Sequence, residues 1–168
     1  DSLVGEKNNG WYQLVMALDF ERSLIGSAAG IQRTVEELVW YVNETKEDGA
    51  SLADDPLIRD ELAEVAVENE VLRMMCYHIA WMYSKGLHPS YESSMSLLFT
   101  SELIRRLANV GMRALGPYGQ LDRDSKWAVL NARIARACLG SISIGVGGGS
   151  NEIQRNIVAM RGLGLPRR

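Results

Sequence analysis

Residues 55–86, with the sequence DPLIRDELAEVAVENEVLRMMCYHIAWMYSKG, decide the fold class of this chain. Their apolar residues recur every three or four positions, as they do along one face of an α-helix. Asp55 is a suitable N-cap, Pro56 suits the first turn of a helix, and Gly86 interrupts the pattern. We therefore predict a helix from residue 56 to about residue 85, with a buried stripe that includes Leu62, Val65, Leu72, Met75, Ile79 and Met82.

The same periodicity continues on both sides of this segment. It predicts helices over residues 11–46, 90–115 and 125–139, and a last short helix over residues 152–161. The breaks between them are rich in glycine, proline or acidic residues, as in KEDGASLADDP (46–56) and GPYGQL (116–121). No strand pattern of useful length, internal repeat or second domain is visible. We predict an all-α fold, namely an antiparallel four-helix bundle with an extra short C-terminal helix.

Composition excludes several classes of function. The 168 residues are 46% hydrophobic and 23% charged with a net charge of −3, which gives no sign of a nucleic-acid-binding protein. There is neither a signal peptide nor an apolar run long enough to span a membrane, so we expect a cytoplasmic protein. Cys76 and Cys138 lie in apolar helical patterns and are expected to be buried thiols. Neither histidine has the Glu-x-x-His spacing of a di-iron bundle, and we predict no metal site.

Glu21 is the first candidate for a chemical role. It lies three residues after Leu18 and four residues before Ile25, so helical spacing places it on or beside the apolar stripe, facing inward. A carboxylate in that place is costly unless it is paired or used, and burial suits a general base near neutral pH. An ion pair with Arg22 or Arg33, or a position at the edge of the stripe, is the alternative interpretation.

The stretch GVGGGSNEIQRN (145–156) is the second candidate, because four glycines occupy five positions directly before a helix. Such a loop allows backbone N–H groups to approach a phosphate or another anion, and Ser150 or Asn151 can cap the helix that follows. It is neither a P-loop nor a G-x-G-x-x-G motif, since no Lys-Ser/Thr follows and no strand precedes it. An irregular turn between two helices is the alternative interpretation.

Four blocks of sequence, read together and in order, resemble the C-terminal third of an acyl-CoA dehydrogenase. They are DSLVGEKNNGW (1–11), LDFERSLIG (18–26), LGPYGQL (115–121) and GGGSNEIQRNIVAMRGLGLP (147–166). The resemblance covers essentially the whole chain. It implies that residues 1–10 are the tail of a preceding middle β domain and that residues 11–168 form the C-terminal helical bundle domain.

This resemblance implies an FAD-dependent enzyme that converts an acyl-CoA thioester into a trans-2-enoyl-CoA. Electrons would pass to an electron-transfer protein, and the subunits would form a homo- or hetero-oligomer, arranged as a dimer of dimers. The 168-residue piece alone is expected to be inactive, because the domain that holds the isoalloxazine ring is missing from it. The acyl chain stays open among straight-chain, branched and sterol-derived thioesters.

The resemblance also assigns a catalytic base. Many members carry it as a glutamate in the last glycine loop, at the position of Gly148 here. Others carry it in a Leu-Asp-x-Glu-Arg stretch on the first bundle helix, which in this chain is LDFER with Glu21 as the glutamate. The remaining implied roles are FAD binding and substrate binding. They fall to Ser150, Glu152, Gly148, Gly149 and Arg113 for FAD, and to Arg22 and Gly147 for the acyl-CoA.

Two departures from the family pattern affect the adenine side of FAD. The Arg-x-x-Phe motif expected after the first bundle helix is replaced by NETKEDGASL (43–52), and the Gln-Ile-Leu-Gly-Gly turn reads RALGP (113–117). An alternative function is therefore a non-catalytic or FAD-contributing subunit of a heteromeric acyl-CoA dehydrogenase. A free-standing helical bundle without a redox role is a third, less favoured interpretation.

Overall fold

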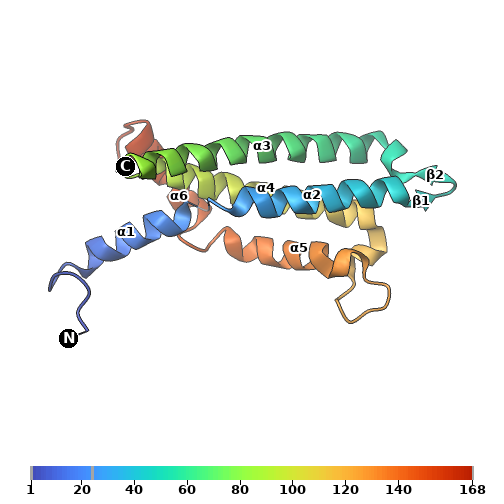
Figure 1. The fold of residues 1–168 in the computed structure, drawn as a ribbon, viewed down its shortest axis with the longest axis horizontal. Coiled ribbons are helices and arrows are strands. Elements are labelled where there is room, and N and C mark those ends of the chain that lie inside the picture. Colours follow the sequence, from blue (N-terminus) through green and yellow to red (C-terminus); the bar gives the residue numbers. More distant parts are fainter. Residues whose placement is uncertain (1, 24, 168) are drawn as a thin grey trace.

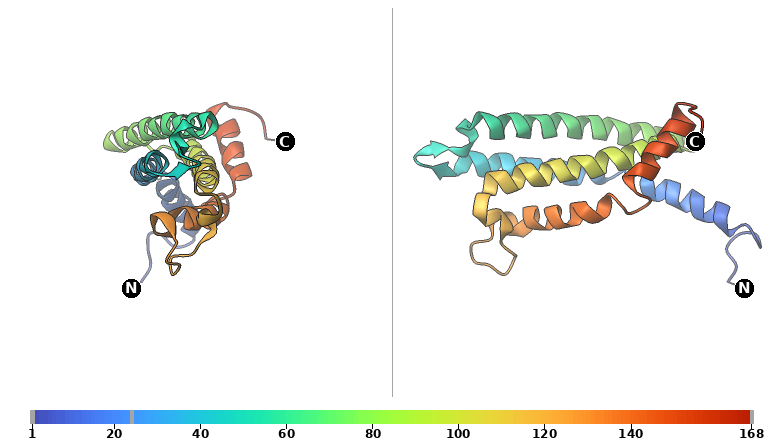
Figure 2. Two further views of the ribbon diagram at one scale, coloured as in Figure 1. Left: turned by 90° about the vertical axis from the view of Figure 1, so that its right-hand side faces the viewer. Right: turned by 180° about the vertical axis from the view of Figure 1, so that it is seen from behind.

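The computed structural model describes residues 2–23 and 25–167. Four helices lie side by side and run in alternating directions (Figures 1 and 2), namely α2 (Ser27–Glu44), α3 (Pro56–Ser84), α4 (Tyr91–Leu115) and α5 (Arg133–Ile144). Two further helices, α1 (Gly10–Arg22) and α6 (Asn151–Ile157), pack against α4. The all-α antiparallel bundle with a short C-terminal helix is thus confirmed.

Each of the four bundle helices contributes a completely buried aliphatic side chain. Leu38 of α2, Leu72 of α3, Leu103 of α4 and Ile134 of α5 are all 0% exposed. Helices α4 and α5 approach closely at Gly111, where a Cβ atom would lie 2.8 Å from Cδ1 of Ile134. These contacts account for the bundle, because burial of large aliphatic side chains is the dominant favourable term in folding.

Helix α3 has the bounds that the sequence predicts. Oδ1 of Asp55 accepts a hydrogen bond from the backbone N–H of Leu57 at 2.8 Å, and Pro56 is the first helical residue. Gly86, directly after the last turn, has a φ of 70°, which a residue with a side chain rarely adopts. The predicted stripe is buried at Leu62, Val65, Leu72 and Ile79, and half-buried at Met75 and Met82.

The single helix predicted over residues 11–46 is wrong. Helix α1 ends at Arg22 and α2 begins at Ser27. Both the backbone N–H and the hydroxyl of Ser23 donate to the carbonyl of Phe20, which tightens the last turn of α1. Gly26, with the lowest helix propensity after proline, follows in the break. As a result α1 turns away from the bundle axis, as Figure 1 shows.

The loop predicted over residues 46–56 contains a small hairpin. Strands β1 (Lys46–Glu47) and β2 (Ala50–Ser51) pair antiparallel, with Lys46 opposite Ser51. The two residues between them, Asp48 and Gly49, have φ angles of 50° and 86°. Two successive positive φ angles are what a two-residue type I′ turn requires. A short 3₁₀ helix, η1 (Leu52–Asp54), connects the hairpin to α3.

The helix predicted over residues 125–139 begins later in the structure. After the 3₁₀ helix η2 (Gly116–Gln120) the chain forms a loop and a second 3₁₀ turn, η3 (Val129–Ala132), and α5 begins only at Arg133. Leu130, Asn131 and Ala132 have φ angles of 49°, 54° and 53°. Three left-handed residues in succession cannot belong to a right-handed α-helix, so the helix starts after them. Helix α6 continues as a π-helical turn, η4 (Val158–Gly162), which accounts for the predicted end near residue 161.

The cysteines agree in part with the expectation of buried thiols. Cys76 is buried and Cys138 is half-buried, and burial raises the pKa of the Cys76 thiol.

None of the helices in the described part of the chain combines the length and the apolar character that crossing a membrane requires. Residues 2–23 and 25–167 contain no group of three or more histidine, cysteine or acidic side chains placed to hold a metal ion.

Candidate functional site

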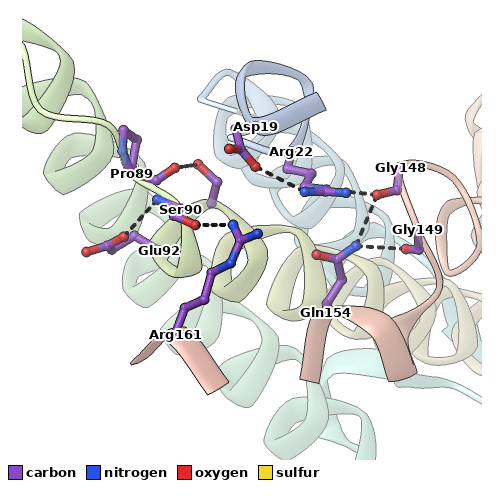
Figure 3. Close-up of polar contacts among 10 residues, drawn as sticks. Asp19, Arg22, Pro89, Ser90, Glu92, Gly148, Gly149, Gln154 and Arg161 are labelled. Carbon is purple, nitrogen blue, oxygen red and sulfur yellow. Dashed lines mark hydrogen bonds and ion pairs between the residues drawn. The ribbon is translucent and has the colours of Figure 1, made fainter. Parts of the chain in front are cut away.

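The glycine loop and the end of α1 meet at one place. The loop, residues 145–150, connects α5 to α6, and it reaches the last turn of α1 across α4 (Figure 3). Nε of Arg22 donates a hydrogen bond to the carbonyl oxygen of Gly148 at 2.9 Å. An open pocket of about 140 Å³ lies at this junction, and its lining consists of Glu21, Arg22, Leu97, Ile144, Gly147 and Gly148. The structure therefore brings four of the predicted site residues together.

Glu21 borders this pocket, but the prediction that it is buried is wrong for this chain. Its side chain is exposed, whereas its neighbour Arg22 is buried. The reason is the orientation of α1, which turns Arg22 toward α4 and the glycine loop. The alternative interpretation, an ion pair of Glu21 with Arg22 or Arg33, is not observed. Arg22 pairs with Asp19 at 3.0 Å, and Arg33 pairs with Glu37 at 3.2 Å.

Two of the loop glycines are required by the chain's own geometry. Gly148 and Gly149 have φ angles of 69° and 102°. A Cβ atom on Gly149 would lie 2.9 Å from Nε2 of Gln154, and one on Gly148 would lie 3.3 Å from Cδ2 of Leu97. The absence of side chains at these two positions is therefore explained without any ligand.

Gly147 is different. Its φ lies outside the positive range, and a Cβ atom there would meet only the carbonyl oxygen of Ser143, at an ordinary distance of 3.6 Å. Gly147 is exposed and lines the pocket beside Glu21. The protein itself has room for a side chain at this position, so the bare surface leaves space for a bound molecule.

Alanine substitutions at Gly149 and at Gly147 should therefore have different effects, the first on stability and the second on ligand binding. We expect Gly149→Ala to destabilise the fold by about 1–3 kcal/mol, because of its positive φ and the contact with Gln154. We expect Gly147→Ala to change the free energy of unfolding by less than about 0.5 kcal/mol and yet to weaken ligand binding at the pocket. Urea denaturation and a ligand titration of both variants would measure this. Equal stability losses at the two positions would show that Gly147 is also a structural glycine.

Some backbone N–H groups of the loop are hydrogen-bonded within the chain and others are not. The N–H groups of Val146 and Gly147 donate to the carbonyl of Ser143. In the part of the chain that the structure describes, the N–H groups of Gly148, Gly149 and Ser150 have no hydrogen-bond acceptor. Three successive half-buried residues thus carry N–H groups that a ligand could accept from.

Ser150 and Glu152 lie together at the start of α6. Ser150 occupies the N-cap position, but its side chain makes no capping hydrogen bond to the helix backbone. The Ser150 side chain instead lowers the pKa of Glu152 by hydrogen bonding to it, with a smaller contribution from the backbone of Glu152 itself. Glu152 is exposed, so at neutral pH this corner carries a negative charge.

Sequence reasoning missed Gln154, and it named Asn151 only as a possible helix cap. Gln154 is 0% exposed, and its Nε2 donates to the carbonyls of both Gly148 (3.1 Å) and Gly149 (2.9 Å). Asn151 accepts a hydrogen bond from the Ser101 hydroxyl at 2.9 Å, which ties α6 to α4. The sequence does contain a signal for Gln154. It lies four residues after Ser150, about one helical turn into the helix that directly follows the loop.

Arg113 lies apart from the other predicted residues. It is in the last turn of α4 and forms an ion pair with Glu61 of α3. Sixteen residues separate it from Leu97 at the pocket, or about 24 Å along the helix axis. The hairpin β1–β2 is at this same end of the bundle (Figure 1), so both sequence departures described above lie at that end.

Residues 8–163 match the family model described as acyl-CoA dehydrogenase, C-terminal domain. The chain belongs to the acyl-CoA dehydrogenase family. It is 33% identical over 168 residues to acyl-CoA dehydrogenase FadE26 of Mycobacterium tuberculosis, covering 98% of this chain and 42% of that protein. The chain thus spans less than half the length of that acyl-CoA dehydrogenase.

Several solved structures share the fold of this chain. The ChsE4–ChsE5 complex from Mycobacterium tuberculosis superimposes with a TM-score of 0.87 at 33% identity, over 98% of this chain and 43% of that chain. The Tcur3481–Tcur3483 steroid ACAD gives a TM-score of 0.85 at 27% identity, over 98% of this chain and 42% of that one. A glutaryl-coenzyme A dehydrogenase bound to glutaryl-CoA gives 0.81 at 26% identity, over 97% and 40%.

Proposed function

We propose that this chain is the C-terminal part of an FAD-dependent acyl-CoA dehydrogenase that forms trans-2-enoyl-CoA, with Glu21 as the catalytic base. The observation that carries the proposal is the shared pocket, which Glu21 lines together with Gly147 and Gly148. Glu21 is the carboxylate that lines this pocket, and the alternative base position is occupied by Gly148. Activity would require the parts of the relatives that this chain does not span, so the 168 residues alone are expected to be inactive.

The chemistry assigned to the pocket is removal of a proton from the α-carbon of the thioester. The carboxylate of Glu21 accepts this proton, while negative charge develops on the thioester oxygen. The backbone N–H groups of Gly148, Gly149 and Ser150 have no acceptor in the described part of the chain, and they are suitable donors to oxygen atoms of the cofactor and of the thioester that lies against it. A substrate that fills the open pocket would exclude water from the carboxylate, which strengthens both interactions.

The residues around the loop fit one wall of an FAD site. Gly147 leaves a side-chain-free surface beside Glu21, and Ser150 and Glu152 offer polar groups at the same corner. FAD, when bound, supplies the acceptor for the hydride that leaves the β-carbon. We assign Ser150, Glu152, Gly148 and Gly149 to the cofactor side and Gly147 to the substrate side. Arg113, about 24 Å from the loop, could contact only a more distant part of the cofactor or the FAD of another subunit.

Helix α3 supports assembly into an oligomer. Its buried residues, Ile58, Leu62, Val65, Asn69, Leu72, Cys76 and Ile79, follow a 4-3-4-3 spacing. A second set with the same spacing, Val67, Val71, Met74, His78 and Trp81, is exposed on the opposite face, with Val67 and Met74 more than 60% exposed. A helix that is apolar on both faces is normally covered on both. We propose that another subunit, identical or homologous, covers this face.

Met74→Lys should therefore weaken assembly. A lysine at the centre of this face would place an unpaired charge in an apolar contact, which costs several kcal/mol. We expect the mass measured by light scattering of the full-length subunit to fall to that of a smaller assembly. Leu57→Lys, at an exposed position of α3 outside the set, is the control. An unchanged mass for Met74→Lys would exclude this face as the interface.

The second candidate function, an FAD-contributing or non-catalytic subunit, is favoured by the far end of the bundle. There the hairpin replaces the expected Arg-x-x-Phe motif, and Arg113 is engaged by Glu61. A heteromeric enzyme would divide the base and the adenine-side contacts between two chains. Flavin content distinguishes the two functions. One FAD per subunit in the purified full-length protein supports the first, and FAD only after mixing with a partner chain supports the second.

The reaction is tested by anaerobic reduction of the flavin. The full-length protein is mixed with acyl-CoA thioesters of straight-chain, branched and sterol-derived types, and the flavin absorbance is followed. Loss of the absorbance with at least one thioester is expected, with the electrons then passing to an electron-transfer protein in the cytoplasm. A flavin-loaded protein that no thioester reduces would contradict the proposed function.

A further inference from the structure

The carbonyl oxygen of Gly148 accepts hydrogen bonds from two side chains that come from opposite ends of the sequence. Arg22 of α1 and Gln154 of α6 meet on this single atom (Figure 3). We propose that Arg22 and Gln154 are positioning residues that hold the glycine loop at a fixed place beside Glu21 and orient its peptide groups. This inference rests on the proposed function, because it concerns the geometry of the same pocket.

Arg22 is suited to this role by its burial and by its two bonds. Its side chain is 10% exposed, Nε donates to Gly148, and Nη1 pairs with Asp19 one helical turn earlier. The ion pair with Asp19 fixes the guanidinium on α1, so the bond to Gly148 fixes the loop relative to α1. Since Arg22 directly follows Glu21, this contact also sets the distance between the proposed base and the loop. A lysine has one charged nitrogen and cannot reproduce the two directed bonds.

Gln154 completes the arrangement from the other side. Both hydrogens of its amide nitrogen are used, one on the carbonyl of Gly148 and one on that of Gly149. In a planar trans peptide the C=O and N–H groups point in opposite directions. Because the two carbonyls point toward Gln154 and Arg22, the N–H groups of Gly149 and Ser150 point away from them. The two side chains thereby orient the amides that lack acceptors in the described part of the chain.

This role differs from the one that the family resemblance implies for Arg22, which is contact with CoA. An arginine that binds CoA contributes to affinity. A positioning arginine contributes to the rate of the chemical step, because misplacing reacting groups by about 1 Å can cost up to a hundredfold in rate. The two roles therefore predict different kinetic constants.

The test uses the full-length, FAD-loaded protein in single-turnover reduction by an acyl-CoA. For Arg22→Lys and for Gln154→Met we expect the limiting rate of flavin reduction to fall about tenfold to a hundredfold. We expect the dissociation constant of acyl-CoA to change by less than about threefold, because uniform substrate binding is kept. Arg155→Lys, an adjacent exposed arginine paired with Glu102, is the matched control and should change neither value. A raised dissociation constant with an unchanged limiting rate would overturn the proposal in favour of CoA binding.

A second measurement does not depend on activity. Amide hydrogen exchange of residues 145–151 should accelerate in Arg22→Lys and in Gln154→Met, while exchange in α3 stays unchanged. Unchanged exchange in the loop would overturn the proposal. If the unmodified protein is not reduced by any thioester, the proposed function fails, and faster loop exchange in the variants would still support the positioning contacts. Two substitutions on different helices keep the test valid if one variant fails to fold.

Discussion

Replacement of Glu21 by glutamine should slow the reduction of the flavin by acyl-CoA about 10³-fold. Glutamine keeps the size of the side chain and one acceptor oxygen but cannot accept the α-proton. Glu21 is exposed and borders an open pocket, so the substitution should leave the fold intact. Anaerobic stopped-flow spectroscopy of the full-length protein, followed at the flavin absorbance, measures the effect. Binding of acyl-CoA should be nearly unchanged, because the lost interaction belongs to the transition state.

Glu44→Gln is the matched control for this experiment. Glu44 is an exposed glutamate in the last turn of α2, away from the pocket, and its replacement should leave the rate unchanged. A Glu21→Gln variant that reduces flavin at the normal rate would exclude Glu21 as the base. The base would then be another carboxylate, and a base on a partner chain would favour the heteromeric alternative.

Leu72→Ala should destabilise the chain by about 3 kcal/mol. Leu72 is 0% exposed and belongs to the buried set of α3 that faces α2 and α4. The substitution removes aliphatic contacts and leaves a cavity between helices that cannot close it, since neighbouring core positions are also filled by large side chains. Urea denaturation of the 168-residue chain and of the variant gives the difference in the free energy of unfolding.

Leu57→Ala serves as the comparison, because Leu57 is in the same helix and is 51% exposed. Its replacement should cost less than about 0.5 kcal/mol. Similar losses for the two variants would mean that Leu72 does not lie in the core of the folded chain. A large loss of unfolding free energy for Leu72→Ala alone would support the description of α3 as a helix with one buried face and one exposed face.

The sequence predicts those parts of the fold that local signals determine. The bounds of α3 follow from Asp55, Pro56 and Gly86, whose effects on the backbone act within one or two residues. The break between α1 and α2 and the late start of α5 could not be predicted in the same way. Gly26 alone is compatible with a continuing helix. Asn131 adopts the left-handed conformation readily, but Leu130 and Ala132 on either side of it do not favour that conformation.

The candidate site was accessible to sequence reasoning only in part. Helical phase singled out Glu21, and the glycine run singled out the loop, but their proximity depends on how α1 and α6 pack on α4. Exposure of Glu21 results from the same packing. Gln154 gave a weak signal, because a polar residue in a short helix is normally solvated. Its full burial becomes visible only once the loop carbonyls are placed.

The absence of a side chain at Gly111 predicts how mutations at this position would behave in a genetic screen. Any side chain at position 111 would collide with Ile134 near the start of α5, and the collision can be relieved only if Ile134 changes rotamer or α5 moves away from α4. Helix α5 ends at Ile144, which lines the pocket, and the next residue begins the glycine loop. Because α5 is a continuous helix, a shift at its start would also displace the loop at its end. In a random screen, substitutions at position 111 would be grouped by phenotype with those in the loop itself, although position 111 lies about 21 Å along α4 from the pocket.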